Sequence, residues 1–255
     1  MKYSFVDGIR LEARPGIRGV CPVCNSPTIP KCGLKRLHHW AHVTTVSCDH
    51  WWEPETEWHR AWKEEFPAEW QESRHVAADG EIHIADVKTA TGTVLEFQHS
   101  PISPNERASR EGFYGRMAWF VNGTRLKKDL SSFQEALTYA WPADLKFRAW
   151  GMSDEASAII ERWRASRCPV LVDFGDGDFS SRWLPKNDLL WLLRYVHGGR
   201  VIATPVSRQS VIEHYLSGTP IRGFPSTASP PPRRRFPMQG FEAYLARRQA
   251  RRPRF

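Results

Sequence analysis

The spacing of hydrophobic residues changes along the chain, and each change predicts a different element. Apolar and polar residues alternate in Ile82–Val87 and Thr93–Phe97, as they do in half-buried strands. The Thr-Ala-Thr-Gly segment between these runs is a turn signal, so we expect a β-hairpin. Residues 53–66 instead carry Trp58 and Trp62 four positions apart, which favours a helix with one buried stripe. A helix is therefore expected just before the hairpin.

A second helix is predicted to begin after Ser103, which is a favourable N-cap residue. The apolar run Met117–Val121 follows it and is typical of a buried strand that ends at an Asn-Gly turn. The order helix, strand pair, helix, strand indicates an α/β fold, with a mixed sheet flanked by helices.

The second half of the chain gives weaker signals. Residues 168–174 predict a buried strand, and residues 187–196 a short amphipathic helix. Residues 200–205 predict another strand, followed by a helix through Tyr215. These elements form either a second α/β unit or an extension of the first sheet. Residues 223–240 are rich in Pro, Ser and Gly and are expected to be a linker.

Composition narrows the class of protein. The 255 residues are 41% hydrophobic and 25% charged, as in an ordinary globular protein, and no run approaches the ~20 apolar residues of a membrane span. The N-terminus lacks the apolar core of a signal peptide, so we expect a cytoplasmic protein without a membrane partner. Net charge is +8, of which +7 comes from eight Arg and one Glu between Pro230 and Phe255. This tail is either a solvated segment or a phosphate-binding one, through Arg247, Arg248, Arg251 and Arg252.

Cysteines and histidines near the N-terminus have the spacing of a zinc site. A Cys-x-x-Cys pair supplies two ligands from one turn, and a His-x-x-His pair further along could supply the other two. The preferred set is Cys21, Cys24, His39 and His42, with Cys32 or Cys48 as a replacement for one histidine. The alternative is a pair of reduced thiols with histidines that only pack. The expected organisation is a zinc-ribbon-like module, an α/β core, an α/β extension and a linker with an Arg-rich tail, at residues 1–50, 51–146, 147–222 and 223–255.

The hairpin carries acids among apolar neighbours. Because side chains alternate along a strand, Asp86 shares a face with Ile82 and Ile84, and Glu96 shares one with Gln98. A carboxylate in such surroundings is costly to bury unless a cation meets it, and two acids on adjacent strands are suitable ligands for Mg²⁺. The alternative is a half-exposed hairpin on the protein surface.

The helix before the hairpin carries a polar stripe. Glu55, His59 and Lys63 fall at i, i+4 and i+8, which places them on one helical face. The stripe is either a solvated ladder of charges or a set of functional groups that faces the hairpin acids.

Four segments of residues 20–122 resemble, in order, the competence-protein CoiA-like family, a branch of the PD-(D/E)XK nuclease superfamily. Most of the superfamily has Lys at the position of Gln98, whereas the CoiA-like family has Gln there. Glu53-Pro54 departs from the pattern, so the first acid of the second segment is either Glu55 or Glu57. The matching segments are Cys-Pro-x-Cys with His-Trp-Ala-His, Glu55-x-x-x-His59-x-x-x-Lys63, Ala85-Asp86 with Leu95-Glu96-Phe97-Gln98-x-Ser100-Pro101-Ile102-Ser103, and Arg110-x-x-x-Tyr114 before the strand that contains Trp119.

The resemblance implies a restriction-endonuclease-like fold and an Mg²⁺- or Mn²⁺-dependent nuclease that acts on DNA, with no indication of oligomeric state. Asp86, Glu96 and the carbonyl of Phe97 would hold the metal, and Gln98 would orient the attacking water. Glu55 would hold a second metal or its water. His59 and Lys63 would supply charge or transfer a proton, and Arg110 and Tyr114 would brace the site or contact the substrate. The rival hypotheses are a zinc-containing DNA-binding protein with an inactive nuclease-like fold and, more distantly, a purely structural zinc protein.

Overall fold

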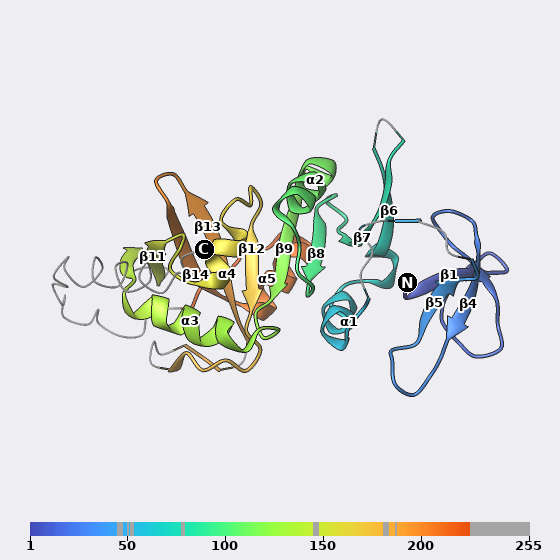
Figure 1. Ribbon diagram of the computed structural model, residues 1–255, viewed down its shortest axis with the longest axis horizontal. Coiled ribbons are helices and arrows are strands. Elements are labelled where there is room, and N and C mark those ends of the chain that lie inside the picture. The colour runs from blue at the N-terminus through green and yellow to red at the C-terminus, as the bar shows by residue number, and fades with distance from the viewer. Residues whose placement is uncertain are drawn as a thin grey trace, which may run out of the picture.

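The chain folds into two β-sheets with helices packed on the larger one (Figure 1). The structure is a computed structural model, and it describes residues 1–44, 48–49, 51, 54–77, 80–144, 148–180, 184–186 and 188–224. The smaller sheet lies at the N-terminal end and the larger sheet holds the rest of the described chain. Within the described residues no helix has the length and apolar character needed to span a membrane.

The N-terminal sheet is antiparallel throughout, with strand order β2-β1-β3-β4-β5. A chain reversal between β3 and β4 contains Cys21 and Cys24, where Asn25 has a positive φ of 59°. Asn tolerates this backbone conformation better than most residues. The strands are β1 (Tyr3–Val6), β2 (Ile9–Glu12), β3 (Gly19–Val20), β4 (Pro27–Lys31) and β5 (His39–His42).

The large sheet is mixed, with strand order β10-β11-β14-β13-β12-β9-β8-β7-β6. Only the pairs β8–β9 and β9–β12 are parallel. Its strands are β6 (Gln71–Val76), β7 (Ile82–Lys88), β8 (Val94–Gln98), β9 (Met117–Asn122), β10 (Trp141–Asp144), β11 (Ala149–Ser153), β12 (Val170–Asp173), β13 (Leu189–Val196) and β14 (Arg200–Ser207). Its helices are α1 (Glu57–Glu64), the short 3₁₀ helix η1 (Ala68–Trp70), α2 (Pro104–Tyr114), α3 (Lys127–Thr138), α4 (Ala158–Trp163) and α5 (Arg208–Ser217).

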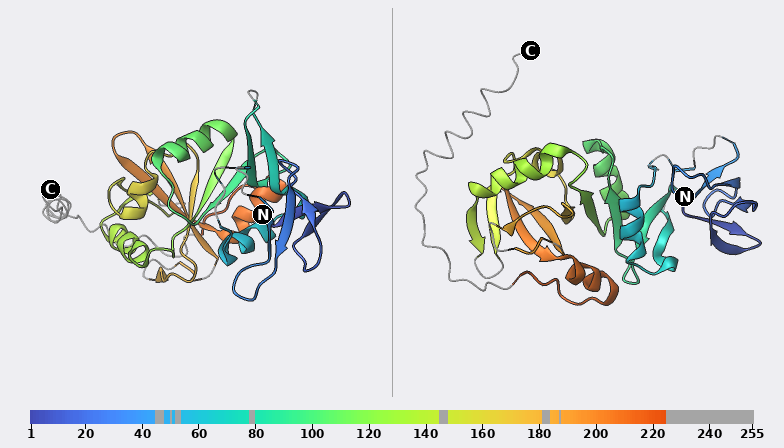
Figure 2. Two further views of the ribbon diagram at one scale, coloured as in Figure 1. Left: turned by 45° about the vertical axis from the view of Figure 1, so that its right-hand side comes forward. Right: turned by 90° about the horizontal axis from the view of Figure 1, so that it is seen from below.

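Helices cover both faces of this sheet (Figure 2). On one face α1 and α5 pack on a cluster that includes Trp62, Phe97 and Phe120. On the other face α2, α3 and α4 pack on a larger cluster that includes Trp119 and Trp191. β8 is buried along its whole length because helices cover both of its faces and strands flank both of its edges. Any polar side chain on β8 therefore lies inside the protein.

The expected mixed sheet flanked by helices is confirmed. Of the two alternatives for the second half of the chain, the structure has the extension, because β10 to β14 continue the same sheet. The helix predicted at 187–196 is wrong, since residues 189–196 form β13. This strand pairs along its full length with β14 across a loop that contains Gly198 and Gly199, both with positive φ. The spacing of apolar residues in this run fits a helix or a buried strand. The Gly-Gly pair is a hairpin signal and favours the strand.

Candidate functional site

Three cysteines and one histidine converge beside the N-terminal sheet. The ligand atoms of Cys21, Cys24, His42 and Cys48 all lie within 4.8 Å of one another. The Sγ atoms of Cys21 and Cys48 are 3.7 Å apart, and Cys24 Sγ lies 3.3 Å from His42 Nε2. Two thiolates held at ~2.3 Å by one tetrahedral Zn²⁺ lie about 3.8 Å apart, whereas disulfide sulfurs lie ~2.05 Å apart. The four residues therefore fit a zinc-type metal.

The preferred zinc set needs one correction, because Cys48 takes the place of His39, which is one of the alternatives stated from the sequence. Residues 39–42 form strand β5, on which residues three apart point to opposite faces. His42 points toward the cysteines, while His39 Nδ1 lies 2.8 Å from the carbonyl oxygen of Leu37. His-x-x-His brings both rings to one side only on a helix. Cys32 lies outside the cluster.

The two hairpin acids lie where β7 and β8 separate. The regular ladder between these strands covers only Val87↔Leu95 and Lys88↔Val94. Beyond it, side chains make the hydrogen bonds between the strands. Phe97 N donates to Asp86 Oδ2 at 2.9 Å, and Asp86 N donates to Glu96 Oε1 at 3.3 Å. The structure thus brings Asp86 and Glu96 together, and it joins Asp86 to the backbone of Phe97.

Glu96 is buried, with 3% of its surface exposed. Its Oε2 accepts a hydrogen bond of 3.0 Å from Arg110 of α2, and Arg110 also donates to the carbonyl oxygen of Trp51. Burial, together with the nearby charge of Asp86, nevertheless raises the pKa of Glu96 to about 8, against the opposing effect of Arg110. A buried acid whose charge is this poorly compensated favours an additional cation.

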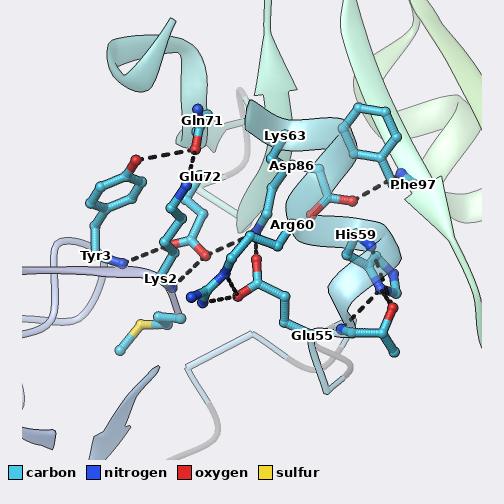
Figure 3. A network of polar contacts seen from close by, with 12 residues as sticks. Lys2, Tyr3, Glu55, His59, Arg60, Lys63, Gln71, Glu72, Asp86 and Phe97 are labelled. Carbon is cyan, nitrogen blue, oxygen red and sulfur yellow. Dashed lines mark hydrogen bonds and ion pairs between the residues drawn. The ribbon is translucent and has the colours of Figure 1, made fainter. Parts of the chain in front are cut away.

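Lys63 lies among three acids, namely Glu55, Glu72 and the hairpin acid Asp86 (Figure 3). Its ammonium contacts Glu55 and lies 3.2 Å from Glu72 Oε1. Burial opposes the charge of Lys63, but Glu72, Asp86 and Glu55 outweigh burial and raise its pKa. Lys63 is 3% exposed, so this charge is held inside the protein.

Glu55 does not join the hairpin acids, although one of the two alternatives for the polar stripe has it face them. It is held by Lys63 and by Arg60, as Figure 3 shows. Burial opposes ionisation of Glu55, but the charge of Lys63 and hydrogen bonds from Lys63 and Arg60 lower its pKa. In the described part of the chain, the zinc-type cluster is the one group of three or more His, Cys, Asp or Glu ligands close enough to share a metal.

His59 closes the N-terminus of α1. The helix begins at Glu57 with Thr56 as N-cap, inside the segment 53–66 that the sequence favours as a helix, so Glu55 precedes the helix. The Thr56 N–H donates to His59 Nδ1 at 3.3 Å, and His59 N–H donates to Thr56 Oγ1 at 3.3 Å. This reciprocal pair is a capping box in which His replaces the usual Glu or Gln. One ring nitrogen of His59 is thereby engaged.

The remaining predicted site residues on the large sheet are buried. Gln98 is 5% exposed, and its Nε2 donates to the carbonyl oxygen of Ser100 at 2.9 Å. It lines a cavity of about 80 Å³ together with Arg125 and Arg162. Arg110 and Tyr114 lie inside the protein, so Arg110 braces Glu96 in this arrangement rather than reaching an exposed phosphate.

Four predicted nucleic-acid contacts lie outside the described residues, namely Arg247, Arg248, Arg251 and Arg252.

Glu72 is the residue of this site that sequence reasoning missed. Its carboxylate accepts hydrogen bonds from Lys63 and from the backbone N–H groups of Lys2 and Tyr3. Burial opposes its ionisation, but Lys63 and the two backbone N–H groups lower the pKa of Glu72 to about 2. Its partners in β1 lie about 70 residues earlier in the chain. No local pattern could have indicated this contact.

Comparison with known proteins gives one distant relative. The chain is 28% identical to the competence protein CoiA of Bacillus subtilis over 137 residues. The match covers 49% of this chain and 36% of the relative, so the chain spans well under half of that protein. The match supports the resemblance to the CoiA-like family. No protein-family model matches the chain, and no solved structure matches it.

Proposed function

We propose that this protein is a metal-dependent nuclease that hydrolyses phosphodiester bonds in DNA, with a competence-related role. The observation that carries the proposal is the pair of carboxylates, Asp86 and Glu96, in the gap between β7 and β8. The raised pKa of Glu96 marks a site that favours a cation. The similarity to a protein named for competence supports the biological role. A restriction-endonuclease-like core around β7, β8 and β9 belongs to the same proposal.

The donors in the gap suit Mg²⁺ or Mn²⁺. Asp86 and Glu96 would hold the metal together with the carbonyl of Phe97, whose N–H already points to Asp86. The N–H and C=O of one strand residue point the same way, so this carbonyl faces the same gap. When bound, the metal would polarise the phosphate and acidify an attacking water. Oxygen donors of this kind are those that Mg²⁺ prefers.

The other residues of the site have positional and electrostatic roles. Arg110 holds the carboxylate of Glu96 from α2. Lys63 keeps a positive charge near Asp86, where it would stabilise charge that develops on a phosphate oxygen. Gln98 has no proton to release and would act only by hydrogen bonding. The Arg-rich tail and the zinc-binding module would contact the DNA backbone without reading its sequence.

The test is cleavage of plasmid and of single-stranded DNA by the purified protein, with and without Mg²⁺ or Mn²⁺. Metal-dependent products that disappear in Asp86→Asn and Glu96→Gln support the proposal. Glu64→Gln is a matched control, because Glu64 is an acid of α1 with a 57% exposed side chain, away from the gap. Equal cleavage by all variants, or none by the wild-type protein, would refute the nuclease.

A DNA-binding protein with an inactive nuclease-like fold is the second candidate. It is favoured by Gln98 in the usual Lys position and by the engagement of Glu55 with Lys63 and Arg60 rather than with the hairpin acids. DNA binding in a gel-shift assay that persists in Glu96→Gln, without any product in either metal, would establish this alternative.

A further inference from the structure

Glu72 occupies an unusual position at the start of β6. Its backbone has a positive φ of 45°, which is uncommon for a residue other than Gly and costs on the order of 1 kcal/mol. Such a conformation persists only where the surroundings hold it. Here the side chain supplies the reason, because it is 12% exposed and both of its oxygens accept hydrogen bonds.

The carboxylate of Glu72 connects two parts of the molecule (Figure 3). Oε1 accepts from Lys2 N at 2.6 Å and from Lys63 Nζ at 3.2 Å, while Oε2 accepts from Tyr3 N at 3.1 Å. Both oxygens of Glu72 are therefore fixed to the backbone at the start of β1. Oε1 also fixes the ammonium of Lys63, whose side chain is otherwise long and flexible.

The β1 strand leads directly to the zinc-type cluster. β1 pairs with β3 through Phe5↔Val20, and Cys21 follows Val20 in the chain. A second contact joins the modules in the same region, because Lys2 Nζ donates to Gln71 Oε1 at 3.1 Å. The anchor of Glu72 is thus part of the module that the metal would hold together.

We propose that Glu72 is a positioning residue, which holds the Lys63 ammonium beside Asp86 and uses the backbone of β1 in the N-terminal module as its anchor. The inference rests on the proposed nuclease function for its kinetic consequence. The placement of Lys63 itself can be measured without activity. Glu72 contacts neither DNA nor metal in this proposal and acts only through Lys63.

The experiment compares Glu72→Gln, Lys63→Met and the double variant in the full chain, with Glu64→Gln as control. The carboxylate of Glu64 pairs with Lys2, whereas the ion-pair partners of Lys63 among the described residues are Glu55 and Glu72. Glu72→Gln should lower kcat by about 10- to 100-fold with KM little changed, since a misplaced catalytic group costs this much. In the Lys63→Met background, Glu72→Gln should have no further effect on kcat, because residues that act as a unit are not additive.

A second readout does not depend on activity. Modification of Lys63 by acetic anhydride, followed by mass spectrometry, should be slow in the wild type and in Glu64→Gln, and about tenfold faster in Glu72→Gln. Glu72→Asp keeps the charge and should restore slow modification in part, which guards against a Gln variant that folds poorly. Unchanged Lys63 reactivity in a folded Glu72→Gln, or full additivity of the two substitutions, would overturn the inference. If the wild type cuts no DNA, the nuclease proposal fails, and Lys63 reactivity alone decides the role of Glu72.

Discussion

The ionised carboxylate of Glu72 stabilises the fold, and Glu72→Gln measures by how much. The pKa of Glu72 is about 2 in the folded protein, against 4.5 for an ordinary glutamate. The difference between these two pKa values corresponds to about 3 kcal/mol of stabilisation of the folded protein at neutral pH. The side chain is 12% exposed, so water screens little of this energy. We expect Glu72→Gln to lower the free energy of unfolding by about that amount at pH 7.

The pH dependence gives this prediction its sign. An acid whose folded pKa is lowered contributes its full stabilisation above its unfolded pKa of 4.5, and loses it as the pH falls through about 2. The difference between wild type and Glu72→Gln should therefore be constant from pH 7 to about 5 and shrink below pH 4.5. Urea unfolding at several pH values measures it. Glu64→Gln should change stability by less than ~1 kcal/mol, because the Glu64 side chain is 57% exposed and Lys2 keeps Glu12 and Gln71 as partners. A Glu72→Gln protein as stable as the wild type at pH 7 would refute the reasoning.

Three further substitutions test other parts of the structure. Cys48→Ser should lose bound zinc, and Cys32→Ser should retain it, because Cys48 belongs to the cluster and Cys32 does not. Metal analysis of the purified proteins measures the bound zinc. His59→Ala should lower the free energy of unfolding by about 1 kcal/mol through loss of the capping box, and an unchanged urea midpoint would contradict that role. Glu96 has a pKa raised by burial and by Asp86, from 4.5 to about 8, so the metal-free protein should lose stability as the pH rises across this range. Glu96→Gln should abolish that loss in thermal melts with EDTA, and a parallel pH profile for both proteins would count against it.

The parts of the fold that depend on local signals could be predicted from the sequence. The strands β7 and β8 and the Ser103 cap of α2 depend on signals that act over a few residues, and each is present in the structure, although only β7 alternates in burial and β8 is buried throughout. The Cys21-x-x-Cys24 pair could be recognised for the same reason, since both thiols lie in one chain reversal. Spacing alone sufficed wherever the neighbours in space are also neighbours in sequence.

Prediction from sequence failed where the position of a side chain depends on the secondary structure around it or on contacts with distant parts of the chain. His39 and His42 lie three positions apart, so their rings point to one side on a helix and to opposite sides on a strand, and the ligand set could not be chosen without knowledge of β5. Residues 189–196 form a nearly continuous apolar run, which a period cannot assign to a helix or to a buried strand. Glu72 finds its partners across about 70 residues, and its sequence neighbours give no sign of them.

The structure also gives a physical account of the Gln98 position. A lysine at position 98 would supply a positive charge near the metal that we propose for the hairpin acids, and Gln98 cannot do so. Lys63 supplies such a charge from α1 instead, held by Glu55 and Glu72 and acting on Asp86. A charge delivered from a helix depends on how that helix is placed, and α1 contacts the N-terminal module through Arg60, which donates to the carbonyl oxygen of His38. In this arrangement the position of the Lys63 charge depends on the N-terminal module. A lysine on β8 would supply its charge without that module.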